Sequence, residues 1–140
     1  MRLKTKKNFT LLDTNIIIAL LDEKDSLHKE AKKLIKESIS DTYAVLDVIL
    51  AETYSVLTRR CRERKYDCGY AVEKLKELEN ALYVVPICIK RYHNEIVEKL
   101  KNEPELNYND WLIVIYAKEK GIKVLTLDKT LDKKLNELLK

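Results

Sequence analysis

The stretch from Asn109 to Asp128, NDWLIVIYAKEKGIKVLTLD, predicts a helix followed at once by a buried strand. Asp110 stands where a helix can begin, and apolar residues dominate the positions up to the charged segment that ends at Lys120. Gly121 is the residue type that most often follows the end of a helix. The apolar run over 123–127 then has the length and composition of a strand. A helix that leads straight into a buried strand is typical of α/β proteins.

The same alternation extends over the rest of the chain. Residues that can cap a helix precede two helical segments, Asp25 and Ser26 before one and Asp47 before another. Short strands separated by helices indicate a mostly parallel sheet that is covered on both faces. The predicted strands are 9–12, 42–46, 81–85 and 123–127, and the predicted helices are 16–21, 27–38, 48–64, 70–79, 92–101, 110–120 and 129–139.

The bulk composition indicates one domain. The chain has 140 residues, of which 46% are hydrophobic, and this is enough for one substantial core. Only two glycines and two prolines interrupt it, and no low-complexity segment or internal repeat suggests a linker. The three cysteines are odd in number and lack the spacing of a zinc site, which fits a reducing, intracellular setting. We therefore expect a single domain over residues 1–140.

The first eight residues are basic, and we expect them to form a tail. Lys4, Lys6 and Lys7 precede an apolar stretch, but Asp13 and Asn15 interrupt that stretch, so it does not resemble a signal peptide. No run of about 18 apolar residues is present that could span a membrane. We expect a cytoplasmic protein without membrane contact. Its net charge of +4 permits a nucleic-acid partner but is too small to require one.

Four acidic residues lie near the predicted carboxyl ends of the strands, where open parallel sheets bind their ligands. Asp13 directly follows the first strand, and Asp128 directly follows the last. Glu52 lies just over one turn into the helix after the second strand, with apolar residues one turn to either side, so we expect its carboxylate to face the sheet. Asp110 begins the helix that leads into the last strand. Each of these acids alone fits a turn, a helix cap or a solvated surface.

Convergence of the four acids would require a cation or protonation. Two like charges 4 Å apart repel by about 4 kcal/mol at an effective dielectric constant of about 20. Oxygen ligands select hard ions, so Mg²⁺ or Mn²⁺ is expected rather than zinc, which prefers histidine and cysteine. The acids therefore predict a site for a divalent metal ion if the fold brings them together.

Three segments of the sequence resemble the PIN domain family. They are FTLLDTN over 9–15, AETYSVL over 51–57 and the stretch 109–128, and together they span nearly the whole chain. The resemblance implies a three-layer α/β/α sandwich with a mostly parallel central sheet of four to five strands. It also implies Mg²⁺- or Mn²⁺-dependent cleavage of RNA that leaves 5′-phosphate and 3′-hydroxyl ends. Many members of the family are toxins of toxin-antitoxin pairs.

By this resemblance, Asp13, Glu52, Asp110 and Asp128 are catalytic metal ligands, and Asn15 and Thr126 support them. The partners that it implies are an RNA substrate, an antitoxin protein and a second copy of the chain in a homodimer. The sequence departs from the family where an acid and an aromatic residue often follow the last metal ligand. Here Thr130 and Leu131 occupy those positions, and Asp132 is open as a substitute. Trp111 is bulkier than the residues usually found beside the third acid, which would narrow the site.

A run of basic residues follows Glu52 on the same predicted helix. It can hold RNA phosphates, with Tyr54 or Tyr66 available to stack on a base. The alternative is a solvated helix end whose positive charge favours the helix dipole. His28 and His93 are expected on the surface. The basic residues that we consider for RNA binding are Arg59, Arg60, Arg62 and Arg64.

Two other functions compete with the nuclease interpretation. One is a PIN-like domain without turnover that serves as an RNA-binding or protein-interaction module. The other, ranked lower, is a phosphatase of the haloacid-dehalogenase type, in which an aspartate after the first strand is the nucleophile of a D-x-D motif. Here Asn15 replaces the second aspartate, and that chemistry has no need of Glu52.

Overall fold

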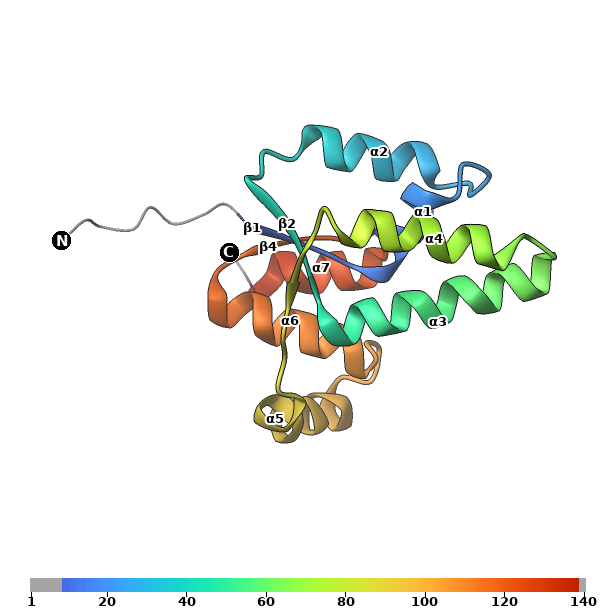
Figure 1. Cartoon of the computed structure of the whole chain (residues 1–140). Helices are drawn as coiled ribbons and strands as arrows, with labels where there is room; N and C mark the ends of the chain where they lie inside the picture. Colours follow the sequence, from blue (N-terminus) through green and yellow to red (C-terminus); the bar gives the residue numbers. More distant parts are fainter. Residues whose placement is uncertain (1–8, 139–140) are drawn as a thin grey trace.

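The chain forms a four-stranded, all-parallel sheet in the order β3-β2-β1-β4. The computed structural model describes residues 9–138, so the predicted basic tail over 1–8 lies outside the described residues (Figure 1). β1 and β2 are the inner strands, and in these two the three residues nearest the carboxyl end are buried. The strands are β1 (Phe9–Leu12), β2 (Thr42–Leu46), β3 (Tyr83–Val85) and β4 (Lys123–Leu125).

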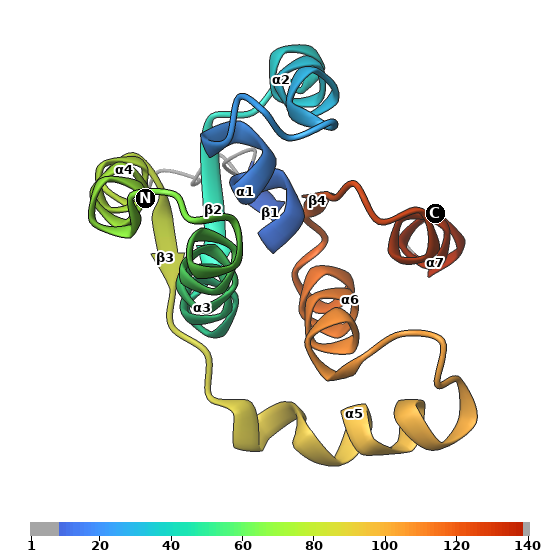
Figure 2. The ribbon, with the colours of Figure 1, turned by 90° about the vertical axis from the view of Figure 1, so that its right-hand side faces the viewer.

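Helices flank this sheet on both sides. Figure 2 shows α2 on one side of the sheet, and α5 and α6 on the other. The prediction of a three-layer α/β/α sandwich with a mostly parallel sheet is therefore confirmed, with four strands. The helices are α1 (Thr14–Leu21), α2 (His28–Glu37), α3 (Asp47–Arg64), α4 (Cys68–Glu79), α5 (Ile89–Asn102), α6 (Tyr108–Lys120) and α7 (Lys129–Leu138).

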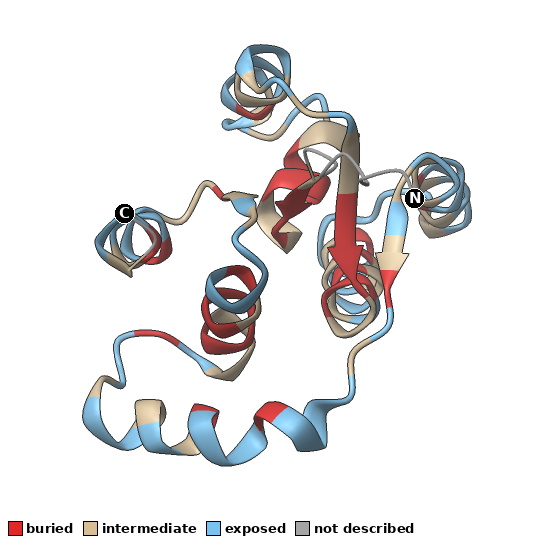
Figure 3. Ribbon diagram, turned by 90° about the vertical axis from the view of Figure 1, so that its left-hand side faces the viewer, coloured by how far each residue is buried: buried red, intermediate tan, exposed pale blue. Residues whose placement is uncertain are grey.

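The apolar middle of α6 is buried, as its sequence predicts. Residues 111–115 are all buried, because α6 packs against α5, α7 and β4 (Figure 3). Trp111 is 0% exposed, and its ring N–H donates to the carbonyl of Glu103 at 3.2 Å. Gly121 ends the helix with φ 66°, in the left-handed region that glycine adopts without strain.

Three predicted helix caps are wrong. α6 begins at Tyr108 with Asn107 as its N-cap, so Asp110 is the third helical residue and does not open the helix. Asp47 is already helical, and its carboxylate accepts from the backbone N–H of Ile87 at 3.3 Å. Leu27 is the N-cap residue of α2 and makes no side-chain cap bond. Asp47 is thus engaged by a distant segment, whereas at α6 the local residue Asn107 takes the cap position.

No helix within residues 9–138 has both the length and the apolar character needed to cross a bilayer.

Candidate active site

The four predicted acids line one cavity of about 280 Å³ beside the carboxyl ends of β1 and β4. Parallel strands end at the same edge of a sheet, which explains why residues more than a hundred positions apart meet here. The cavity is lined by Asp13, Thr14, Asn15, Ile18, Asp25, Leu27, Glu52, Val56, Arg60, Asn107, Asp110, Leu127 and Asp128.

Asp13 is the most buried of the four acids, at 7% exposure. It is the N-cap residue of α1, and its Oδ1 accepts from the backbone N–H of Thr14 at 2.8 Å. Its Oδ2 accepts from the hydroxyl of Thr126 at 2.8 Å. Burial raises the pKa of Asp13, and the nearby carboxylates of Glu52 and Asp128 raise it further, against the lowering effect of these hydrogen bonds.

Asn15 and Thr126 join the end of β1 to the loop after β4. The backbone N–H of Leu127 donates to Oδ1 of Asn15 at 2.9 Å, and the amide of Asn15 donates to Thr126 Oγ1 at 3.2 Å. The backbone N–H of Asp128 also donates to Thr126 Oγ1, at 3.0 Å. These bonds hold the Thr126 hydroxyl that donates to Asp13, and they fix the loop that carries Asp128.

The apolar residues around Glu52 on α3 predicted a buried side chain, but Glu52 is more exposed than that. It is half-buried, whereas Ile49 is 1% exposed and faces the core. The hydroxyl of Thr14 donates to Oε1 of Glu52 at 3.3 Å and lies 3.2 Å from the hydroxyl of Thr53. The side chain thus lines the cavity beside the sheet and is not buried with Ile49.

Asp110 belongs to a capping box at the start of α6. Its backbone N–H donates to Oδ1 of Asn107 at 2.9 Å, and its Oδ2 accepts from the backbone N–H of Asn107 at 3.2 Å. Burial raises the pKa of Asp110 to about 6, and the charges of Asp13, Asp128 and Glu52 contribute in the same direction. The carboxylates thus interact electrostatically across the cavity.

Asp128 lies three residues beyond the end of β4, because that strand stops at Leu125. The prediction that Asp128 directly follows the strand is therefore wrong. Its Oδ1 accepts from the backbone N–H groups of Thr130 and Leu131 at 2.9 and 3.1 Å. The Asp128 carboxylate thus accepts hydrogen bonds from free backbone N–H groups in the first turn of α7, and Asp128 also lines the cavity.

The donor chemistry of the cavity fits a hard, hydrated cation. Within residues 9–138, no three histidine, cysteine or acidic side chains form a ready-made cluster for an ion. Mg²⁺ keeps several of its waters and is commonly held through one or two carboxylates, so it does not need such a cluster. The cavity has the oxygen donors and the volume for this kind of binding.

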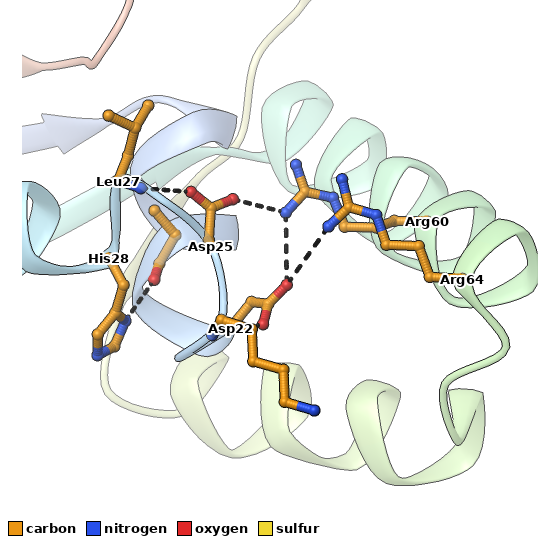
Figure 4. A network of polar contacts seen from close by, with 8 residues as sticks. Asp22, Asp25, Leu27, His28, Arg60 and Arg64 are labelled. Atoms are coloured by element: carbon orange, nitrogen blue, oxygen red, sulfur yellow. Dashed lines mark hydrogen bonds and ion pairs between the residues drawn. The ribbon is translucent and has the colours of Figure 1, made fainter.

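Of the four arginines considered for RNA binding, only Arg60 lines the cavity. Its Nη1 lies 2.7 Å from Oδ2 of Asp25 and 3.6 Å from Oδ2 of Asp22 (Figure 4). Arg64 lies 3.9 Å from the same oxygen of Asp22. Arg59 and Arg62 are exposed on α3.

Several other residues raised by the sequence lie outside the cavity. The hydroxyl of Tyr54 donates to Glu79 of α4 at 2.6 Å, and burial together with this carboxylate raises its pKa to about 12. Asp132 is exposed on α7, and Trp111 is in the core and does not narrow the cavity. His93 is exposed, as expected, whereas His28 is half-buried with Nδ1 2.7 Å from the carbonyl of Ala19.

Three polar lining residues were not predicted as site residues from the sequence, although Asp25 was named there as a helix-cap candidate. They are Thr14, Asp25 and Asn107. The capping pattern of Asn107 followed three positions later by Asp110 resembles a capping box and could have identified one of them. Asp25 had no comparable signal, because the loop between α1 and α2 alone brings it to the cavity.

Comparison with known proteins agrees with this architecture. The structure of VapC20 from Mycobacterium tuberculosis, described as a sarcin-ricin loop cleaving toxin, is similar with a TM-score of 0.73 and 19% identity, covering 89% of this chain and 94% of that one. VapBC2 from Rickettsia felis, bound to a DNA fragment from its promoter, has a TM-score of 0.65 and 20% identity, covering 94% of this chain and 96% of that one.

A third similar structure is PAE2754 from Pyrobaculum aerophilum, with a TM-score of 0.65 and 20% identity, covering 93% of this chain and 85% of that one. At these identities the likeness concerns the fold. A search among curated proteins found no match. The model of the PIN domain family matches residues 10–135. The chain therefore belongs to the PIN domain family.

Proposed function

We propose that this protein is an endoribonuclease that hydrolyses RNA phosphodiester bonds with Mg²⁺ or Mn²⁺ held in the acidic cavity. The observation that carries the proposal is the convergence of Asp13, Glu52, Asp110 and Asp128 on one cavity, with burial and mutual repulsion raising the pKa of Asp110 to about 6. Carboxylates that repel one another favour a divalent cation between them.

The four acids would hold the ion directly or through water. A divalent ion bound there would polarise the phosphate and would lower the pKa of a water molecule. The chain itself supplies orientation: Thr126 and Asn15 fix Asp13, and the capping box fixes Asp110. Glu52, held by one long bond from Thr14, has the most freedom to adjust. No side chain is needed as a nucleophile, because water attacks the phosphorus.

We further propose that the protein acts in the cytoplasm as the toxin of a toxin-antitoxin pair, as a homodimer restrained by an antitoxin. Support comes from membership of the family and from two similar structures, one described as a cleaving toxin and one a VapBC complex bound to DNA. We also propose that residues 1–140 form one domain. A gene for a small protein beside this one would support the toxin role, and a solitary gene would favour RNA processing.

The alternative is a PIN-like domain without turnover that serves as an RNA-binding or protein-interaction module. The structure gives no support to a phosphatase of the haloacid-dehalogenase type. Asn15, at the position of that family's second aspartate, ties the loop after β4 to the end of β1.

The test is incubation of the purified protein with single-stranded and structured RNA, in Mg²⁺, Mn²⁺ or EDTA, followed by analysis of the fragment ends. In the proposed reaction water attacks the phosphorus and the bond to the 3′ oxygen breaks, which leaves 5′-phosphate and 3′-hydroxyl ends and requires the metal. Cyclic-phosphate ends would show attack by the ribose 2′-hydroxyl and would overturn the proposed reaction. Cleavage in EDTA would overturn the metal dependence, and RNA binding without cleavage would favour the silent module.

A further inference from the structure

Arg60 is the one basic residue that lines the acidic cavity, among the residues that the structure describes. Five carboxylates line the same cavity, those of Asp13, Asp25, Glu52, Asp110 and Asp128. Such a surface repels a polyanion, so RNA needs positive charge beside the metal to approach closely. A guanidinium at this place is therefore informative about how the substrate lies.

The position of Arg60 on α3 sets its distance from the acids. Glu52, Val56 and Arg60 follow one another at intervals of four residues, which places them along one face of the helix, and all three line the cavity. Eight residues correspond to about 12 Å along the helix axis. Arg60 is thus displaced along the helix from Glu52 while it lines the same cavity.

The ion pairs of Arg60 engage only one of its nitrogens. Nη1 contacts Asp25 at 2.7 Å and Asp22 at 3.6 Å (Figure 4). Within residues 9–138, Nη2 and Nε of Arg60 make no hydrogen bond, although the side chain is only 25% exposed. Asp25 is fixed in turn, since its Oδ1 accepts from the backbone N–H of Leu27 at 2.8 Å. Nη1 is therefore anchored by the two aspartates, and the Nη2–Nε edge has no protein partner among residues 9–138.

We infer that Arg60 binds a phosphate of the RNA beside the scissile one, through its Nη2–Nε edge, while Asp25 positions the guanidinium. This edge presents two parallel N–H donors, the arrangement that binds two phosphate oxygens at once. The inference rests on the proposed function for the identity of the substrate. It makes Arg60 a residue that sets the register of the RNA across the cavity, distinct from the exposed Arg59 and Arg62.

The test combines binding and cleavage of a short fluorescein-labelled single-stranded RNA. Binding is followed by anisotropy in EDTA, where no metal-dependent cleavage occurs, and cleavage by single-turnover kinetics in Mn²⁺. Arg60→Gln should weaken binding about tenfold, and the slope of log affinity against log salt should fall by about 0.7. In the cleavage assay, the half-saturating protein concentration should rise while the maximal rate stays unchanged. Arg60→Lys should restore only part of the affinity, because an ammonium group cannot bind two oxygens in parallel.

A phosphate-by-phosphate comparison separates this role from a structural one. Replacing single phosphates by uncharged methylphosphonates should weaken binding of the native protein at one position beside the scissile bond. Arg60→Gln should lose sensitivity at that position alone. Arg91→Gln, at an ion-paired arginine of α5 outside the cavity, is the control, and its pattern should equal the native one. If Arg60 only ties the loop between α1 and α2 to α3, its replacement would lower the melting temperature and leave the pattern intact, which would overturn the inference.

The two proposals fail in different ways. Metal-dependent cleavage with an unchanged binding slope and unchanged methylphosphonate pattern in Arg60→Gln overturns the role of Arg60 and leaves the nuclease standing. Binding that depends on Arg60, without cleavage in any metal, supports Arg60 and overturns the proposed hydrolysis. If the native protein does not bind RNA, both the nuclease proposal and the role of Arg60 are overturned.

Discussion

The hydroxyl of Thr126 donates a hydrogen bond of 2.8 Å to Oδ2 of Asp13, across 113 positions of sequence. This bond crosses between neighbouring parallel strands, since Asp13 follows β1 and Thr126 follows β4. It lowers the pKa of a carboxyl group that burial raises. Thr126 thus keeps Asp13 oriented and closer to the ionised form that a metal requires.

Replacement of Thr126 by valine should weaken metal binding more than folding. The change removes a bond to Asp13 and the acceptor of the Asn15 amide, and we expect a stability loss of about 1 kcal/mol. Loss of an orienting partner should weaken Mn²⁺ affinity about tenfold, measured by calorimetric titration. Thr126→Ser should retain native affinity, and Thr130→Val is the control. Equal affinities of Thr126→Val and the native protein would contradict the positioning role.

Divalent ions should stabilise the fold through Asp110. A ligand that binds only the folded state at about 100 times its dissociation constant adds about 2.7 kcal/mol of stability. We expect Mn²⁺ or Mg²⁺ to raise the melting temperature of the native protein and of Asp132→Asn, whose side chain lies outside the cavity. Asp110→Asn should lose the increase, and an unchanged response in that variant would show that Asp110 is no ligand.

The raised pKa of Asp110 predicts a pH-dependent difference in stability without metal. Its pKa is about 6 when folded, against 3.8 for the ordinary group, so the folded state retains a proton that the unfolded chain has lost. Stability should therefore fall as pH rises between about 4 and about 6. In EDTA, Asp110→Asn should be more stable than the native protein at pH 7 by about 1 kcal/mol, after a discount for solvent screening.

Below a pH of about 4 this advantage of Asp110→Asn should vanish, because both states of the native protein are then protonated at Asp110. Urea unfolding at a series of pH values measures the difference. Asparagine preserves the acceptor that the capping box needs, so the comparison isolates the charge. A difference that did not change with pH would show that the charge at Asp110 is not the cause.

Replacement of Asn107 should lower both the stability of α6 and the affinity of the site for metal. Removal of its cap in Asn107→Ala should cost about 1 kcal/mol of unfolding free energy and loosen the turn that carries Asp110, because the backbone N–H of Asp110 loses its side-chain acceptor. We expect weaker Mn²⁺ binding in this variant and near-native binding in Asn107→Ser, which keeps an N-cap acceptor. Denaturant unfolding and calorimetric titration measure the two effects. Native metal affinity in Asn107→Ala would mean that the capping box does not position Asp110.

The sequence predicted the parts of the fold that depend on local patterns. The apolar run of β1 followed by Asp13, and the helix ended by Gly121 before β4, are local signals, and the parallel sheet follows from their alternation. The sequence also predicted that the four acids lie together, because residues that follow parallel strands share one edge of the sheet.

Features set by distant contacts were not predictable. Asp47 bonds to Ile87 rather than capping its helix, and the pairing of Asp25 with Arg60 depends on how the loop after α1 meets α3. The half-buried state of Glu52 has the same origin, since apolar neighbours one turn away do not reveal the cavity beside it. Periodicity identifies the face of a helix, but tertiary packing decides what that face meets.

The most direct test of the central claim compares RNA cleavage by the native protein, Asp13→Asn and Asp132→Asn in Mn²⁺ and in EDTA, with products resolved on a gel. Asp13 lies in the cavity and Asp132 lies outside it on the surface of α7. We predict that the native protein and Asp132→Asn cleave in Mn²⁺ and not in EDTA, and that Asp13→Asn cleaves in neither. Cleavage by Asp13→Asn at the native rate would contradict the assignment of the acidic cavity as the active site.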